Sequence, residues 1–227
     1  MSAYDTEREA FRRFIVGEPI PLRHLIVLSL KSLLEILEMA IRYVPGGLGY
    51  KIRSLYYRLR LRKIGKNVLI DTGVFLNGPR NISLSDFVWI EANSRIEAML
   101  GEVSIGRRVH IGPFSIIYAR EPVTIGDYVD LSSFVRIYSS SEHPVDGKRM
   151  NVLMPEEWKG VIAKPITLHK DSFVGTGSVL LPGAELGEGA VVGANSVVST
   201  PVAPQFVVWG VPARVIGKRA KVTAPDV

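Results

Sequence analysis

The chain has 227 residues, of which 47% are hydrophobic, and it contains no cysteine. This length suits one large core with a smaller attachment. The lack of cysteine excludes disulfides, thiolate metal sites and a cysteine nucleophile. The net charge of +6 is uneven, because residues 1–63 hold 12 basic and 6 acidic side chains whereas residues 64–227 hold 16 of each. The excess indicates an anionic partner for the N-terminal segment.

The N-terminal segment, residues 1–63, is predicted to be helical and basic. Residues 22–44 contain no proline or glycine and predict a long helix. Its charges follow one stripe of the helix surface, at Lys31, Glu35, Glu38 and Arg42. Residues 45–47, Pro-Gly-Gly, end this helix. A second helix is predicted from about Tyr50 to Lys63, with 6 cations and no acidic residue.

Two interpretations of these helices stay open. Basic residues beside aromatic and aliphatic ones suit the headgroup level of an anionic membrane, so residues 22–63 are expected to bind such a surface. Alternatively, both helices only cap the next domain and pack together in an oligomer. No signal peptide is evident, which favours a cytoplasmic protein, peripheral on the inner face of the cell membrane. No nucleic-acid motif accompanies the charge, so no nucleic acid is expected as a partner.

From Ile64 to Val198, branched aliphatic residues recur every six positions, a period that neither an α-helix nor a single strand has. Three such hexapeptides make one turn of a parallel β-helix whose aliphatic side chains point inward. The steps between successive turns are 20, 21, 20, 43 and 18 residues, and the extra residues fall at one corner. The turns are predicted to start at Ile64, Leu84, Ile105, Ile125, Leu168 and Leu186.

The expected division is therefore mainly β. Residues 1–63 form the helical segment, residues 64–203 form the β-helix, and residues 204–227 form a C-terminal tail. The step of 43 residues contains an excursion over about residues 139–165, which is predicted to be the active-site loop. The segment from Val207 to Lys221 is expected to leave the repeat and run back along its side.

Several motifs, taken together, resemble those of the hexapeptide-repeat O-acetyltransferases, over about residues 64–219. The resemblance implies a left-handed parallel β-helix, an exception to the usual right-handed crossover. It implies a homotrimer with active sites between subunits and acetyl-CoA as the donor. It also implies transfer of the acetyl group to a hydroxyl of a sugar or surface-polysaccharide precursor. Besides the repeats, the motifs are residues 141–146 (Ser-Glu-His-Pro-Val-Asp), 164–167 (Lys-Pro-Ile-Thr), 182–187 (Pro-Gly-Ala-Glu-Leu-Gly) and 208–217 (Val-Trp-Gly-Val-Pro-Ala-Arg-Val-Ile-Gly).

A hydroxyl that attacks a thioester must lose its proton, and a neutral histidine suits that task. The resemblance assigns this general base to His143, which stands in the family's His-Pro context. Its second ring nitrogen needs a partner, and Glu142, Asp146 and a backbone carbonyl all stay open. No close-spaced ligand set exists, so no catalytic metal is expected. The less favoured histidines are His24, in the apolar helix, and His110 and His169, in the repeats.

The resemblance lays the pantetheine arm of acetyl-CoA beside the last turns and puts basic residues near the nucleotide phosphates. It implies an oxyanion donor in the backbone N–H of Gly175, two residues after Phe173. Ser115 takes the place of an acceptor-contacting asparagine. The residues expected to bind acetyl-CoA are Gly175, Ser178, Gly193, Ala194, Ser199, Arg214 and Lys218.

Direct attack in a ternary complex is favoured over an acyl-enzyme, because the chain has neither a cysteine nor a Gly-x-Ser-x-Gly elbow. Two other functions remain open. One is N-acetylation of an amino sugar, and the other is a trimeric scaffold that binds without catalysis.

Overall fold

A computed structural model describes residues 3–143 and 147–226. Its contacts divide the chain into two compact units, Met1–Tyr43 with Glu142–Ile162 and Val44–Ser141 with Ala163–Val227. The third helix of the N-terminal segment therefore groups with the repeat domain. The excursion that carries His143 groups with the first two helices.

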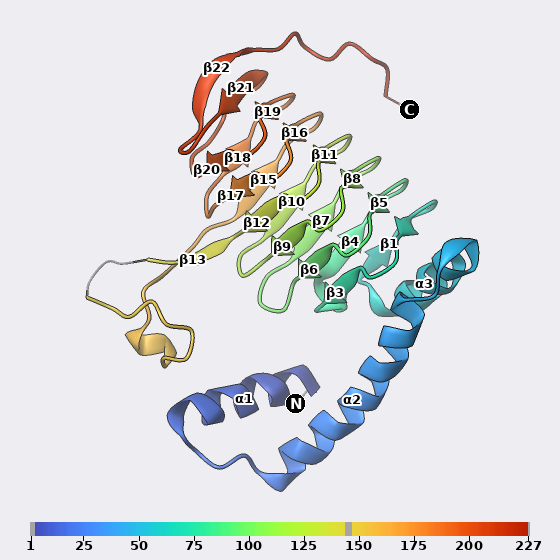
Figure 1. Cartoon of the computed structure of the whole chain (residues 1–227), viewed down its shortest axis with the longest axis vertical. Helices are drawn as coiled ribbons and strands as arrows, with labels where there is room; N and C mark the ends of the chain where they lie inside the picture. Colours follow the sequence, from blue (N-terminus) through green and yellow to red (C-terminus); the bar gives the residue numbers. More distant parts are fainter. Residues whose placement is uncertain (1–2, 144–146, 227) are drawn as a thin grey trace. The chain divides into compact units, whose positions relative to one another are not determined.

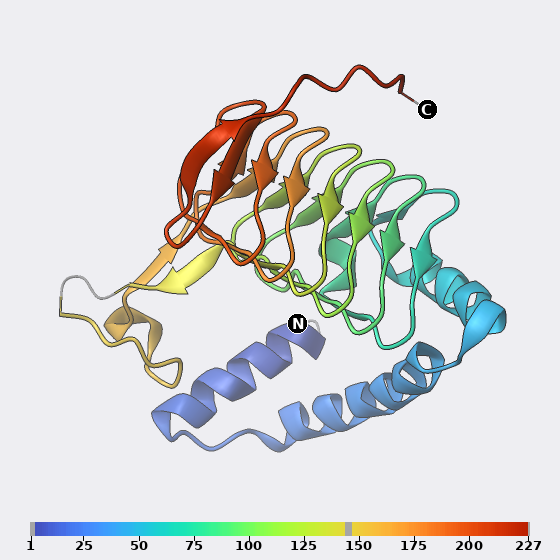
Figure 2. The same cartoon turned by 45° about the horizontal axis from the view of Figure 1, so that its top comes forward.

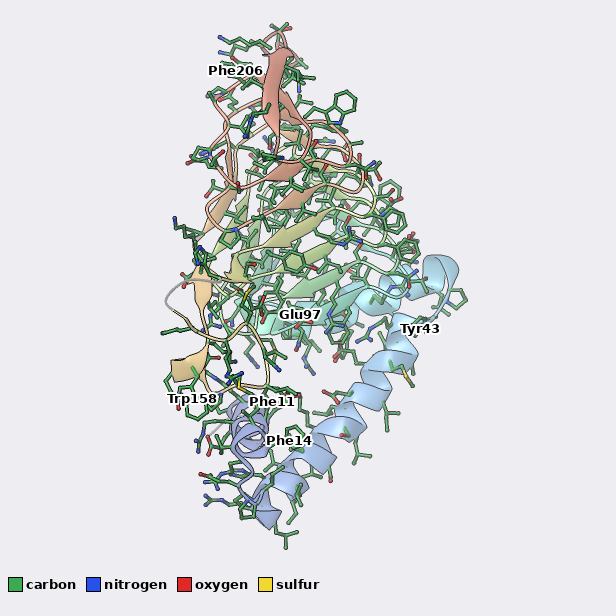
Figure 3. All side chains as sticks on the ribbon, turned by 60° about the vertical axis from the view of Figure 1, so that its left-hand side comes forward. Phe11, Phe14, Tyr43, Glu97, Trp158 and Phe206 are labelled. Carbon is green, nitrogen blue, oxygen red and sulfur yellow. The ribbon has the colours of Figure 1, made fainter. Side chains whose placement is uncertain are left out.

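The first unit contains two helices and part of the excursion (Figure 3). Helix α1, Ala3–Val16, lies in the segment predicted to be helical, although its bounds were not predicted. Helix α2, Leu22–Arg42, lies where the sequence predicts it. An ion pair between Glu7 of α1 and Lys31 of α2 links them. The 3-10 helix η2, Glu156–Trp158, belongs to the excursion. The pairing of Glu9 with Arg13, at 3.0 Å, supports α1 by the i,i+4 rule.

The second unit is a parallel β-solenoid built from three sheets (Figure 1). The first sheet comprises β1 (Lys63–Ile64), β4 (Ile82–Leu84), β7 (Val103–Ile105), β10 (Val123–Ile125), β15 (Ile166–Leu168) and β18 (Glu185–Leu186). The second comprises β2 (Leu69–Ile70), β5 (Trp89–Ile90), β8 (His110–Ile111), β11 (Asp130–Leu131), β16 (Phe173–Val174), β19 (Val191–Val192), β21 (Phe206–Trp209) and β22 (Arg214–Lys218). The third comprises β3 (Phe75–Asn77), β6 (Arg95–Glu97), β9 (Ile116–Tyr118), β12 (Arg136–Tyr138), β17 (Val179–Leu180) and β20 (Val197–Val198).

The predicted repeat is confirmed strand by strand. The first sheet pairs the residues predicted to start the turns, from Ile64 with Leu84 to Leu168 with Leu186. Every residue predicted to start a turn after Ile64 is buried, and Ile64 itself, in the first turn, is half-buried. Because each strand alternates inward and outward side chains, the residue before each buried aliphatic faces outward. The same register therefore stacks outward residues of successive turns.

The corners between the sheets hold the chain in left-handed backbone conformations. At the corner after the first sheet the positive φ angles belong to Asn67, Phe87, Arg108, Tyr128, Asp171, Gly189 and Gln205. At the next corner they belong to Gly73, Asn93, Phe114, Phe134, Gly177 and Asn195. Glycine and asparagine adopt this conformation at little cost, whereas it strains bulky side chains. Aromatic residues at four of these corners are thus an unusual choice.

The third corner takes the extra residues, as predicted. It carries the 3-10 helix η1, Pro79–Asn81, in an early turn. The long excursion leaves and re-enters at this same corner, where the N–H of Lys164 donates to the carbonyl of Ser139 over 3.0 Å. Strands β13 (Ser140–Glu142) and β14 (Val161–Ala163) pair at its base.

The C-terminal segment differs from the expectation. Val207 and Val208 stay in the repeat, because β21 pairs in parallel with β19. The chain turns back only afterwards, and β22 pairs antiparallel with β21 (Figure 2). The expectation that the chain leaves the repeat at Val207 is therefore wrong. The hairpin covers the open end of the second sheet, and Phe206 lies at that end of the solenoid (Figure 3).

Helix α3, Gly46–Arg60, caps the other end. It starts earlier than predicted and ends before Lys63. Its Arg53 is fully buried and donates from Nε to the carbonyl of Ile70 over 2.7 Å and from Nη1 to that of Val44 over 2.6 Å. Burial lowers the pKa of Arg53, and the negative charge of Asp71 opposes that shift. The carbonyl of Ile70 lies at the end of the ladder, where no further turn donates to it, and this cation satisfies it.

Arg53→Met removes those two hydrogen bonds while keeping the length of the side chain. We expect a loss of about 3 kcal/mol in the free energy of unfolding, because buried carbonyls lose a charged donor. The exposed Arg58 of the same helix offers the matched control, Arg58→Met, which should change little. Urea denaturation followed by circular dichroism measures both. Equal midpoints for the two variants would contradict the role of Arg53 as a cap.

Candidate active site

The predicted base, His143, directly follows β13 and belongs to the first unit. It is half-buried, and its backbone N–H donates to the carbonyl of Gly160 over 2.8 Å. Its Nδ1 is buried and has no hydrogen-bond partner among the residues that the structure describes. Glu142 therefore does not hold that nitrogen. The other candidate, Asp146, lies outside the described residues.

Ser115 and Ser178 are not on the surface. Both are buried at equivalent corners of the solenoid. The hydroxyl of Ser178 donates to the carbonyl of Gly193 over 3.0 Å and accepts from the N–H of Ser196 over 3.2 Å. That of Ser115 donates to Ser132 and accepts from Val135 in the same way. These hydroxyls close the corners, and contact of either residue with acetyl-CoA or acceptor stays a prediction.

Gly175 and Gly193 also serve the ladder of the solenoid. The N–H of Gly175 donates to the carbonyl of Val192 over 2.8 Å, which contradicts its expected use for an oxyanion. A Cβ on Gly175 would lie 2.6 Å from the backbone nitrogen of Ala194, so the corner requires glycine. Gly193 lies under the ring of Trp209, whose Nε1 donates to the carbonyl of Ala194 over 2.9 Å. Ala194 itself is exposed.

The structure brings together two of the other residues predicted to bind acetyl-CoA. Ser199 and Arg214 both line a hollow of about 380 Å³ at the C-terminal end of the solenoid. Arg214 and Lys218 lie on β22, where both are exposed, and the ammonium of Lys218 lies 4.5 Å from the centre of the Phe206 ring. The hollow is largely apolar, and its further lining includes Val198, Val202, Phe206, Val208 and Pro212.

A cluster that the sequence interpretation passed over lies on the outer face of the second sheet. Trp89, His110 and Asp130 stand in register on β5, β8 and β11. Nδ1 of His110 lies 2.7 Å from Oδ1 of Asp130, and its Nε2 lies 3.3 Å from Oε2 of Glu91. The rings of Trp89 and His110 are 5.1 Å apart. The signal was in the sequence, because His110 and Asp130 each precede a buried repeat aliphatic in neighbouring turns.

The carboxylates of this cluster orient the imidazole ring of His110. A carboxylate only accepts hydrogen bonds, so Nδ1 of His110 donates to Asp130. Its Nε2 faces the second carboxylate, that of Glu91. Asp130 and Glu91 keep 48% and 25% of their side-chain surface exposed, so both carboxylates can meet a ligand.

Neither a metal centre nor a membrane span emerges from residues 3–143 and 147–226. Within these ranges, no set of three histidine or acidic side chains has an arrangement that could hold a metal ion. Across the same residues, no helix combines the length and the hydropathy needed to cross a bilayer.

Sequence comparison finds related transferases. The profile of the bacterial transferase hexapeptide family (six repeats) matches residues 165–200. The chain is 34% identical over 160 residues to the dTDP-4-amino-4,6-dideoxy-D-glucose acyltransferase of Escherichia coli, covering 70% of this chain and 83% of that protein. It is 28% identical to the putative colanic acid biosynthesis acetyltransferase WcaF of E. coli K12, covering 76% and 78%.

Structure comparison points the same way. AntD, an N-acyltransferase from Bacillus cereus solved with dTDP and 3-hydroxybutyryl-CoA, superposes with a TM-score of 0.69. The identity is 27%, over 74% of this chain and 88% of AntD. A single-site variant of AntD, solved with dTDP-4-amino-4,6-dideoxyglucose and coenzyme A, gives a TM-score of 0.70 at 26% identity, over 74% and 89%.

Proposed function

The chain belongs to the hexapeptide-repeat acyltransferases, and from this premise we propose that it transfers an acyl group from coenzyme A to the amino group of a nucleotide-linked sugar. The likeness to the E. coli dTDP-4-amino-4,6-dideoxy-D-glucose acyltransferase, which extends over 83% of that protein, carries this proposal. The shared fold with AntD, which binds dTDP and an acyl-CoA, supports it.

The proposed reaction is a direct transfer in a ternary complex. The amine attacks the thioester carbonyl, a nitrogen–carbon bond forms, and the carbon–sulfur bond breaks to release coenzyme A. The chain offers no cysteine to hold the acyl group as an intermediate. Ser199, Arg214 and Lys218, in and beside the hollow at the C-terminal end, are the proposed contacts of coenzyme A. Two of these are cations, which suit its phosphates.

Transfer to a sugar hydroxyl, which the resemblance implies, is the second candidate. The likeness to the putative lipopolysaccharide biosynthesis O-acetyl transferase WbbJ of E. coli K12, at 28% identity over 94% of that protein, favours it. Both candidate reactions are compatible with the homotrimer that the resemblance implies. The two reactions differ in their demand for a base, because a hydroxyl is a poor nucleophile until it loses its proton.

The acceptor atom can be identified from the product. We expect the wild-type protein to convert acetyl-CoA and dTDP-4-amino-4,6-dideoxy-D-glucose to an amide, which survives mild alkali. An ester from dTDP-6-deoxy-D-glucose, which carries a hydroxyl at the same carbon, would be cleaved by alkali. Mass spectrometry before and after alkali distinguishes the two. Acetylation of the hydroxyl compound alone would overturn the amine proposal and favour the second candidate.

His143 remains the proposed general base. In either reaction the attacking atom carries one proton too many once its bond to carbon has formed, and a neutral imidazole can take it. Nδ1 of His143 is buried and has no hydrogen-bond partner among the described residues, so Asp146 stays a proposed partner.

His143→Ala should lower kcat by about two orders of magnitude, the usual contribution of a general base. The protein should unfold at the same urea concentration as the wild type, because Nδ1 of His143 makes no hydrogen bond within the described residues. His169→Ala, directly after β15 of the first sheet, provides the control. Retention of full activity by His143→Ala would refute the assignment of the base.

We also propose that the N-terminal helices associate with an anionic membrane surface. Helix α2 exposes more than half the surface of many aliphatic side chains, at Leu22, Ile26, Leu30, Leu33, Leu34, Ile36 and Leu37. Such a surface is costly in water, and together with the basic excess of residues 1–63 it suits an interfacial helix.

The full-length protein should therefore float with vesicles that contain phosphatidylserine, and added salt should release it. Substitution of Leu30, Leu33 and Leu37 by Glu should abolish flotation, whereas Leu100→Glu on the exposed surface of the solenoid should not. If the wild-type protein never floats, the helices serve as caps or oligomer contacts instead.

A further inference from the structure

The cluster on the second sheet has a composition that suits one kind of ligand. Two carboxylates, Glu91 and Asp130, flank one imidazole, and a Trp ring with 40% of its surface exposed lies beside them. An ammonium group is attracted by carboxylates and by aromatic rings. Sugar rings pack their apolar faces on such rings. We propose that this cluster is the acceptor subsite, which binds and deprotonates the amino group of the sugar; this rests on the proposed function.

The solenoid holds the members of this subsite rigidly. Their backbones are joined by the ladder, in which the N–H of Trp89 donates to Val109 and that of His110 donates to Val129. Ile90, Ile111 and Leu131 anchor the same strands in the core without measurable exposure. A subsite on rigid strands keeps its geometry better than one on loops.

Deprotonation is necessary because a sugar amine enters largely as an ammonium ion, which has no lone pair for attack. Glu91 is partly exposed, and its Oε2 lies 3.3 Å from Nε2 of His110, which orients the carboxylate. One proton of the ammonium passes to Glu91, which releases it to solvent. The second proton leaves after attack, and the products are the amide, the thiol of coenzyme A and one released proton.

Exposed aromatic rings continue this surface in the same turns. Phe114 and Phe134, four residues beyond His110 and Asp130, stack at 5.2 Å with an interplanar angle of 7°. They keep 48% and 47% of their surface exposed in strained backbone conformations, with φ of 59° and 60°. Exposed rings held at such a cost provide a platform on which a nucleobase can stack. A nucleotide-linked amino sugar matches both parts of this surface.

Glu91→Gln and Asp130→Asn keep the shapes of the side chains and remove their charges. Calorimetry should show that the wild type binds dTDP-4-amino-4,6-dideoxy-D-glucose at least about tenfold tighter than dTDP-6-deoxy-D-glucose. Either substitution should remove most of that preference. The control is Glu185→Gln, because Glu185 pairs with His169 over 2.8 Å on the first sheet. It should leave the preference intact.

His110 acts through Glu91 and is therefore a positioning residue, which a pH profile can reveal. With acetyl-CoA and the amino sugar nucleotide, His110→Gln should lose activity near neutral pH. It should regain about tenfold in kcat/KM per pH unit up to the pKa of the amine, because only free amine then reacts. His169→Gln should follow the wild-type profile.

These results separate the subsite from the proposed function. The subsite proposal would be overturned if the preference for the amine survived both carboxylate substitutions. It would also be overturned if His110→Gln had the same pH profile as the wild type. Either outcome counts even if the wild type forms the amide. Binding with the expected preference but without amide formation would support the subsite and overturn the proposed reaction.

Discussion

The parallel main-chain ladder that joins each turn of the solenoid to the next governs everything else in this molecule. It requires a carbonyl and an N–H from each strand to meet those of the neighbouring turns, which fixes the register. Once the register is fixed, each buried aliphatic residue stacks on the equivalent residues of the neighbouring turns, and each outward residue does the same. The cap by Arg53 follows from the same requirement, because the first turn would otherwise leave carbonyls unpaired.

The ladder also explains how a rigid scaffold carries chemistry. His110 and Asp130 are far apart along the chain but directly opposed across β8 and β11. Their hydrogen bond therefore needs no loop to hold it. The variable corner has the opposite property, because extra residues there disturb no ladder bond, and the longest insertion carries His143. One part of the molecule thus supplies fixed side chains, and the other supplies a segment free to differ in length.

Much of this fold could be predicted from the sequence. The six-residue period identified the core positions and the corner that bulges, because buried aliphatic residues recur wherever the ladder turns inward. The bounds of helix α1 were not predicted, because its residues carry no comparable repeat. The backbone hydrogen bonds of Ser115 and Ser178 could not be predicted, because a small polar residue at a corner can serve either a ligand or the backbone. The pair of His110 and Asp130 was within reach, because the step between Ile105 and Ile125 also separates these two residues.

The central claim is that the outer face of the second sheet holds the acceptor. A crystal structure of the protein with dTDP-4-amino-4,6-dideoxy-D-glucose and coenzyme A tests it most directly. The account predicts the sugar nitrogen within hydrogen-bond distance of Glu91 or Asp130, with the sugar ring against Trp89. A sugar bound elsewhere, for example in the hollow lined by Ser199 and Arg214, would contradict it.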